Sequence, residues 1–145
     1  MNPLDLREIE FQSDGLRDSL TQAMSPELFH QNLKREIASS KRGGDELVIV
    51  SLRLAPNGFP SVAAFQEALI KIAFALSSGL RGDDFFGRLS DAGFWLLLRT
   101  RELDADGIMQ RLQLPHNDQI TRSLIARSGL DYLEWVEKVD LAHFQ

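Results

Sequence analysis

The order of apolar segments constrains the fold of this chain more than any other feature. Short runs rich in β-branched or large apolar residues predict four strands, at Leu47–Leu52, Phe85–Leu89, Phe94–Arg99 and Ile120–Ala126. One helical pattern lies between the first and second strands, and another lies between the third and fourth. The order strand, helix, strand, strand, helix, strand is that of a split βαβ, ferredoxin-like fold. We therefore expect an α+β domain with a four- to five-stranded, mainly antiparallel sheet backed by helices.

Capping residues and apolar periodicity predict where the helices begin. Ser25 marks the start of an extra N-terminal helix, and Ser61 marks the start of the next one. A third helix is expected from about Leu103 to Leu112, and Ser128 with Asp131 predicts the start of the last. The apolar positions expected to face the sheet are Phe29, Leu33, Ile37, Val62, Phe65, Leu69, Ile72, Ala73, Leu76, Leu133, Val136 and Val139.

Composition excludes several classes of protein. The 145 residues include 16 Lys and Arg against 21 Asp and Glu, for a net charge of −5, and no cysteine. Disulfides and thiolate chemistry are therefore excluded, and three separated histidines without paired spacing argue against a transition-metal site. Without a basic block, a general nucleic-acid binder is not expected. No apolar run suggests a membrane span and no export leader opens the chain, so we expect a cytoplasmic protein without a cofactor.

The chain is expected to form one domain after a short N-terminal segment. Residues 1–17 are mixed and lack a clean period, which predicts an arm or a short helix. Residues 18–145 contain no repeat, low-complexity tract or linker. With 43% hydrophobic residues, a domain of this length is expected to bury one substantial core.

Several segments resemble, in order, those of GGDEF-type diguanylate cyclases, whose palm-like fold is a relative of the ferredoxin arrangement. Asp18-Ser19-Leu20-Thr21, followed by Phe29 and Leu33, is similar to the family's DxLTGLxNRxxFxxxL opening. The later landmarks are the strand Leu47–Leu54, the helix end Ile72-Ala73-Phe74-Ala75-Leu76, the segment Arg81-Gly82-Asp83-Asp84, Gly87-Arg88-Leu89, Phe94-Trp95-Leu96-Leu97-Leu98, the strand Ile120–Ala126 and Val139-Asp140-Leu141-Ala142-His143-Phe144. The resemblance covers the chain from about Asp18 onward and implies a GGDEF-like domain.

The family's signature motif is replaced in this chain. Gly43-Gly44-Asp45-Glu46 nearly spells it but precedes the first predicted strand, so we interpret it as a helix stop and a solvated loop. In the family, the signature lies on the hairpin between the two middle strands, where this chain has Ser90-Asp91-Ala92-Gly93-Phe94. By this resemblance, Ser90 and Asp91 replace the glycines that let GTP approach the backbone, and Ala92 and Gly93 replace the acidic pair.

The resemblance also implies that the residues that hold metal ions and read guanine are missing. Family members use carboxylates to hold the divalent ions that neutralise the triphosphate, and Ala92 and Gly93 offer none. The second metal-holding position falls on Ser51, with Arg53 at the other acidic position, and Ala55–Gln66 replaces the guanine-reading stretch. The sequence therefore predicts a domain with no metal site and no cyclase activity.

A second family motif, the product-binding RxxD, is retained. Arg81 and Asp84 match it, and Phe85–Leu89 supplies the five residues that separate it from Ser90 in the family register. A guanidinium can donate two hydrogen bonds to guanine or to a phosphate, and a carboxylate can accept from the N1 and N2 hydrogens of guanine. The spacing predicts both side chains on one side of a helical turn, and Arg111 lies near the position of an additional family arginine. The alternative interpretation is an exposed ion pair worth a few tenths of a kcal/mol.

Three functional hypotheses follow from these residues. The leading one is a catalytically inactive GGDEF-like domain that binds cyclic di-GMP through Arg81 and Asp84 and acts as a receptor or regulatory module. The second is a nucleotide-free module that forms a homodimer or docks on a partner signalling protein. The third is an allosteric GTP-binding domain beside a phosphodiesterase domain. In all three, Phe94 and Trp95 are interpreted as core of the central strand, and Trp135 and Tyr132 as helix packing.

Overall fold

The computed structural model describes residues 16–43 and 46–143. The arm predicted over residues 1–17 lies outside the described residues except for Leu16 and Arg17, as do Gly44 and Asp45 of the near-signature sequence. The elements are α1 (Pro26–Gly43), β1 (Leu47–Leu54), the short 3-10 helix η2 (Pro56–Gly58), α2 (Val62–Gly79), β2 (Phe85–Ser90), β3 (Gly93–Arg99), α3 (Glu102–Leu112), η3 (Asn117–Gln119), β4 (Ile120–Ala126) and α4 (Tyr132–His143). The predicted order of strands and helices is confirmed.

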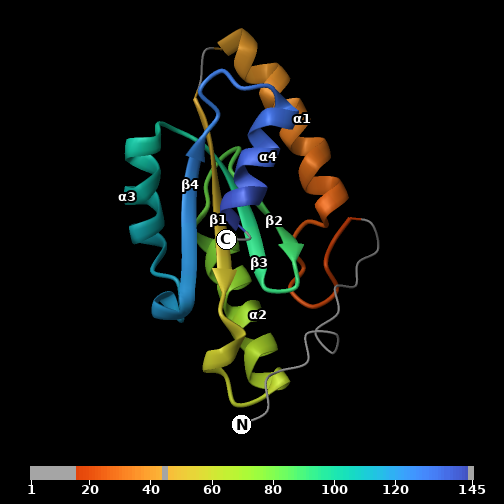
Figure 1. Ribbon diagram of the computed structural model, residues 1–145, viewed down its shortest axis with the longest axis vertical. Coiled ribbons are helices and arrows are strands. Elements are labelled where there is room, and N and C mark those ends of the chain that lie inside the picture. The colour runs from red at the N-terminus through yellow and green to blue at the C-terminus, as the bar shows by residue number, and fades with distance from the viewer. Residues whose placement is uncertain (1–15, 44–45, 144–145) are drawn as a thin grey trace.

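The strands form one antiparallel sheet in the order β2-β3-β1-β4 (Figure 1). β1 lies in the middle, where Ser51 pairs with Trp95 of β3 on one side and with Ser123 of β4 on the other. β2 and β3 are joined by a tight turn at Asp91 and Ala92, so the predicted hairpin is confirmed. The four-stranded sheet and its order confirm the predicted fold class.

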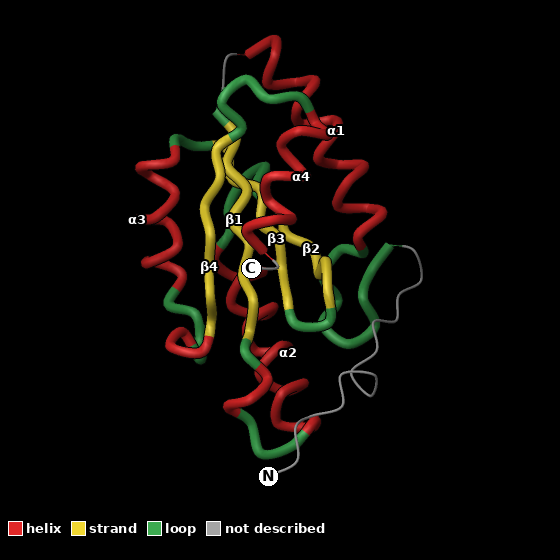
Figure 2. The backbone as a smooth tube through the Cα atoms, in the orientation of Figure 1, coloured by secondary structure: helices red, strands yellow, loops and turns green. Residues whose placement is uncertain are grey.

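Helices cover both faces of the sheet, which divides the apolar interior into two layers (Figures 1 and 2). Val48, Val50 and Leu52 pack in the layer that contains α2 and α3, whereas Leu47 and Ile49 pack in the layer that contains α1 and α4. β1 therefore needs apolar residues at successive positions rather than at alternate ones. The single expected core is thus two clusters with the sheet between them.

Side-chain caps start α1 and α2 where the sequence predicts. The Oγ of Ser25 accepts a hydrogen bond from the N–H of Leu28 at 3.2 Å, and the Oγ of Ser61 accepts one from Ala64 at 3.1 Å. By length and composition alone, α2 is apolar enough to cross a membrane. In this fold its apolar face covers the sheet, with six buried residues: Phe65, Ala68, Leu69, Ile72, Ala73 and Leu76.

The start of α4 differs from the prediction. Asp131 caps the helix, because its Oδ1 accepts from the N–H of Glu134 at 2.8 Å, whereas Ser128 lies in the preceding turn with φ of 48°. The face that packs on the sheet also differs in part from the prediction. Leu133 is 74% exposed, while Trp135 and Val139 are fully buried. The prediction for Leu133 was wrong because the apolar pattern of this short helix admits more than one face.

Candidate functional site

The three charged residues singled out by the RxxD resemblance surround one pocket. Arg81 and Asp84 come from the loop between α2 and β2, and Arg111 comes from the last turn of α3. The cavity has a volume of about 250 Å³. Its other lining residues are Ser78, Gly79, Leu80, Ile108 and Leu112. The fold therefore brings Arg111 to the same pocket as Arg81, which lies 30 positions earlier in the sequence.

Arg81 and Asp84 lie on a tight turn and not on a helical one. α2 ends at Gly79, and Leu80 is already extended. Gly82 then adopts a left-handed conformation, with φ of 61°, and the N–H of Asp84 donates to the carbonyl of Arg81 at 3.1 Å. The expected helical turn was wrong because this glycine reverses the chain. No ion pair joins the two side chains, so the alternative interpretation as an exposed pair is also not observed.

The Asp84 carboxylate is held by the end of β3. Its Oδ1 accepts a hydrogen bond from the N–H of Arg99 at 3.0 Å, and the described residues offer no partner to Oδ2. Burial raises the pKa of Asp84 above its ordinary value, and the bond from Arg99 acts in the opposite direction. One carboxylate oxygen is thus committed to the fold, while the other is left to accept from a ligand.

Arg99 also ties this site to α1. Its Nε donates to the Oε2 of Glu36 at 2.7 Å, and its Nη2 forms an ion pair with the same carboxylate. No sequence signal predicts this contact, because Glu36 and Arg99 are 63 positions apart and match no motif. Asp84 is therefore connected through Arg99 to a helix on the other side of the strand.

Arg81 and Arg111 supply positive charge to the pocket. Both residues are exposed, and within residues 16–43 and 46–143 neither guanidinium has an ion-pair or hydrogen-bond partner. Each can therefore donate its full set of N–H groups to an acceptor that enters the pocket. Two guanidinium groups beside one carboxylate suit a ligand that has both anionic oxygens and N–H donors.

The hairpin at the signature position offers a poor donor set for metal ions. Ala92 and Gly93 have no oxygen-bearing side chains, and the main-chain carbonyl of Ala92 accepts from the N–H of Leu54 at 2.8 Å. Ser51 is buried, and its Oγ shares a hydrogen bond of 2.6 Å with the Oγ of Ser123. These residues do not fit the divalent ions of the family, which need several carboxylate oxygens. Phe94, the last residue of this segment, is part of the core.

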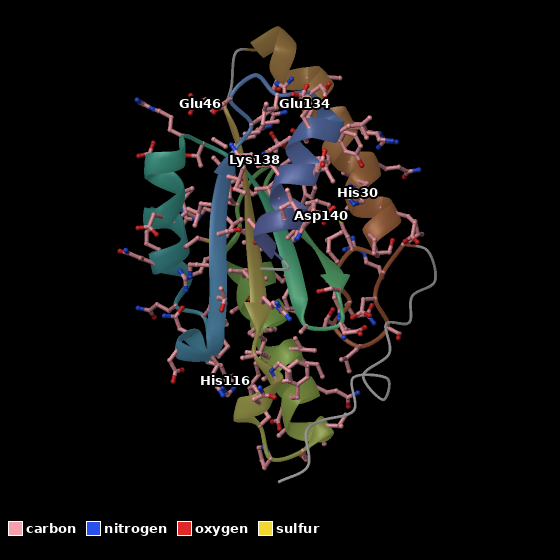
Figure 3. The ribbon with its side chains drawn as sticks, in the orientation of Figure 1. His30, Glu46, His116, Glu134, Lys138 and Asp140 are labelled. Carbon is pink, nitrogen blue, oxygen red and sulfur yellow. The ribbon has the colours of Figure 1, made fainter. Side chains whose placement is uncertain are left out.

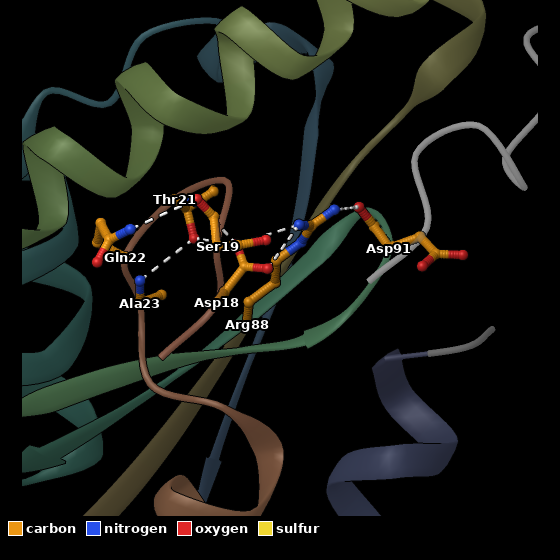
Figure 4. A network of polar contacts seen from close by, with 7 residues as sticks. All are labelled: Asp18, Ser19, Thr21, Gln22, Ala23, Arg88 and Asp91. Atoms are coloured by element: carbon orange, nitrogen blue, oxygen red, sulfur yellow. Dashed lines mark hydrogen bonds and ion pairs between the residues drawn. The ribbon is translucent and has the colours of Figure 1, made fainter. Parts of the chain in front are cut away.

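A buried ion pair holds the hairpin to the N-terminal loop (Figure 4). The Nη1 of Arg88 donates to both oxygens of Asp18, at 3.0 and 3.1 Å, and its Nη2 donates to the carbonyl of Asp91 at 2.8 Å. The Oδ2 of Asp18 also accepts from the N–H and the Oγ1 of Thr21, at 2.8 and 2.6 Å. Both charged side chains are fully buried. Both segments match family motifs in the sequence, but no sequence pattern predicts the contact between them.

A second polar cluster lies on the α1 and α4 side of the sheet (Figure 3). The Nδ1 of His30 shares a hydrogen bond of 2.8 Å with the hydroxyl of Tyr132. Burial lowers the pKa of His30, and it raises the pKa of Tyr132 and of Asp140. This cluster joins α1 and α4. Throughout the described ranges, no three His, Asp or Glu side chains are arranged to hold a metal ion.

No protein-family model matches the sequence, and no curated protein matches it. Solved structures do match. The diguanylate cyclase SiaD from Pseudomonas aeruginosa, solved in complex with its activator SiaC, superposes with a TM-score of 0.71 and 26% sequence identity. That match covers 88% of this chain and 56% of the cyclase chain.

Two structures from Caulobacter crescentus are covered over most of their own length. The GGDEF domain of DgcB, in complex with cyclic di-GMP, has a TM-score of 0.76 and 15% identity over 93% of this chain and 91% of its own. A sensory box/GGDEF family protein has a TM-score of 0.75 and 18% identity over 88% of this chain and 95% of its own. The sheet order, the covering helices and these matches agree: the chain has the fold of GGDEF domains, which is the diguanylate cyclase fold.

Proposed function

We propose that this chain is a receptor domain that binds cyclic di-GMP in the pocket formed by Arg81, Asp84 and Arg111. The observation that carries the proposal is the convergence of these three side chains on one cavity, with both guanidinium groups unengaged by the described residues. The similar domain of DgcB was solved in complex with cyclic di-GMP. A receptor would act by population shift, because the ligand would favour one arrangement of the domain with its partner over another.

The chemistry of the pocket matches that ligand. Arg81 and Arg111 can donate to the O6 and N7 acceptors of guanine or to a phosphate, and the Oδ2 of Asp84 can accept from the N1 or N2 hydrogens. Sites for whole drug-sized ligands measure about 300–1,000 Å³, and this cavity measures about 250 Å³. The cavity is therefore slightly smaller than the sites that enclose whole drug-sized ligands, and we propose that one guanine nucleotide of the cyclic molecule enters it.

We further propose that the domain does not synthesise cyclic di-GMP. Ser51, Ala92 and Gly93 stand where the family resemblance requires carboxylates, and the nearest acidic residue, Asp91, is a single carboxylate on the turn. Incubation with GTP and Mg²⁺, followed by chromatography, is expected to yield no cyclic di-GMP. Turnover above the buffer background would overturn this part of the proposal.

Calorimetry with cyclic di-GMP and with GTP tests the receptor role. We expect the wild type to bind cyclic di-GMP and Arg81→Ala to bind at least about 10-fold more weakly, because hydrogen bonds from a charged donor are lost. Arg101→Ala is the matched control, since Arg101 lies at the opposite end of α3 and pairs with Asp104 at 3.8 Å on the surface. Its affinity should equal that of the wild type.

The other outcomes identify the alternatives. Binding of GTP alone would favour the allosteric GTP-binding domain. Binding of neither nucleotide would refute the receptor and leave a protein-interaction or dimerisation module, for which the SiaD structure with its activator is the relevant parallel. The cytoplasmic location expected from the sequence is part of the same proposal.

A further inference from the structure

The two edges of the sheet differ. At the β2 edge, the loop before α1 forms a parallel bridge between Met24 and Gly87, and the carbonyl of Met24 accepts from the N–H of Arg88 at 3.0 Å. The pairing of β2 also shifts register between Arg88 and Ser90. At the opposite edge, β4 pairs with β1 in unbroken register, and no other strand of the described residues pairs with it. β4 is therefore the open edge of the sheet.

The register identifies the main-chain groups of β4 that face outward. The N–H of Arg127 donates to the carbonyl of Leu47 at 2.9 Å, in line with the β1–β4 ladder. Because bonded and non-bonded pairs alternate in an antiparallel ladder, odd-numbered residues of β4 bond to β1 and even-numbered ones point away from it. The outward N–H groups without an acceptor in the described part of the chain are those of Arg122, Leu124 and Ala126.

We propose that the outer edge of β4 is a docking site for an extended segment of a partner protein, which joins the sheet as an antiparallel fifth strand. Outward N–H groups and carbonyls along one strand are the groups that such a segment bonds. The inference does not depend on the nucleotide pocket.

The side chains of β4 define the chemistry of this partner. Ile120, Leu124 and Ala126 pack against the core cluster on the α2 and α3 side of the sheet. Arg122 lies between them in the same alternation, and its Nη2 donates to the neutral side chain of Asn117. It forms no ion pair with the described residues, and β4 contains no acidic residue. Opposite charges on directly paired strands stabilise a sheet and like charges destabilise it. The partner segment therefore has an acidic residue opposite Arg122 and apolar residues on either side of it in the alternation.

The position of α3 favours a separate segment over a second copy of this chain. Figures 1 and 2 show α3 on the outer side of β4. Ala105 and Met109 hold it in the core, and within the described residues no hydrogen bond joins it to the main chain of β4. A second copy paired antiparallel through β4 would bring its own α3 to the same face. Two helices would then meet at the junction, whereas an extended segment adds only a strand.

Nitrogen-proton NMR titration with a synthetic peptide tests the proposal. The probe is acetyl-Thr-Val-Thr-Val-Thr-Glu-Thr-Val-Thr-amide, in which the valines and the glutamate would face β4 and the glutamate would lie opposite Arg122. We expect saturable shifts centred on residues 120–126. Methylation of the main-chain nitrogen of the second valine, opposite Leu124, should weaken binding at least about 10-fold because hydrogen bonding to the edge is lost. Methylation of the threonine that follows it is the matched control and should change the affinity by less than about 2-fold.

A charge exchange tests the predicted pairing with Arg122. Replacing the glutamate of the peptide by lysine should weaken binding to the wild type by about 5-fold, and Arg122→Glu should reverse the preference between the two peptides. Arg101→Glu is the matched control, because it makes the same change of charge on the surface of the protein and away from β4. That variant should keep the wild-type preference.

Amide hydrogen exchange tests the edge without a peptide. The N–H groups of Arg122 and Leu124 should exchange at least about 10-fold faster than those of Ser123 and Ile125, and the peptide should slow them. Equal protection of all four in a chain that sediments as a monomer, or an equal loss of binding with both methylated peptides, would overturn the proposal. Shifts confined to residues outside β4, or none at all, would also overturn it. Dimers in sedimentation with residues 120–126 protected would replace the partner segment by a second copy.

Discussion

Removing the guanidinium of Arg88 tests the role of the buried ion pair most directly. Arg88 and Asp18 are both 0% exposed, and the arginine also donates to the carbonyl of Asp91 in the hairpin turn. In Arg88→Ala, the Asp18 carboxylate would keep only the two donors of Thr21 among the described residues. We expect a strongly destabilised chain, because a charge would remain buried without a counter-charge.

The magnitude follows from the contacts that are lost. Removing one partner of a buried ion pair costs about 3–5 kcal/mol, and the lost hydrogen bond to Asp91 adds about 1 kcal/mol. Against a typical total stability of about 5–15 kcal/mol, this is a large fraction. At about 2–4 °C per kcal/mol for a chain of this size, the melting temperature should fall by roughly 8–24 °C.

Urea unfolding measures the loss, followed by the fluorescence of Trp95 and Trp135, which are 2% and 0% exposed. Arg101→Ala is the control, because its partner Asp104 lies 3.8 Å away and the two side chains are 81% and 60% exposed. That variant should lose less than about 1 kcal/mol. The reasoning is refuted if Arg88→Ala is no less stable than this control.

Two predictions concern pH. Burial lowers the pKa of His30, so its stabilising contribution is present above about pH 6.5 and is lost as the pH falls toward the folded-state pKa. Urea unfolding at about pH 7.5 and 5.5 should therefore show a loss of stability at the lower pH, and His30→Asn should reduce that loss. An equal loss of stability in the wild type and the variant would contradict this. Burial raises the pKa of Asp84, so its contribution is present below about pH 4 and is lost as the pH rises. In Asp84→Asn, the amide oxygen can still accept the hydrogen bond from Arg99. The variant should therefore have a higher melting temperature than the wild type at about pH 7 and lose this difference below about pH 4. A lower melting temperature than the wild type at neutral pH would count against the burial argument.

Local patterns predicted the parts of the fold that depend on local physics. The alternation of apolar runs with capped helices indicated the order of elements, and β4 begins and ends at the predicted residues, Ile120 and Ala126. The prediction failed at the start of α4, where Ser128 and Asp131 are both good cap residues and the side chain of Asp131 is the one that caps the helix. Local sequence signals predict the start of a helix where one residue can cap it, and they are insufficient where two residues can.

The candidate site was likewise predictable only in part from the sequence. Arg81, Asp84 and Arg111 could be proposed from motif register, and the structure does place them around one pocket. Their supports could not be predicted. The bond from Arg99 to Asp84 joins elements whose spacing only the folded chain sets.

The contacts that shape the hairpin are separate from those that shape the pocket. At the hairpin end of β2, the turn is held by the guanidinium of Arg88 and by main-chain bonds at Asp91 and Ala92, none of which uses a side chain of the signature segment. The pocket at the other end of β2 is held by α2, α3 and the end of β3. Neither set of contacts uses an acidic side chain at residue 92 or 93. A hairpin without carboxylates at these two positions is therefore compatible with the pocket at the other end of β2, and the proposed receptor requires that combination.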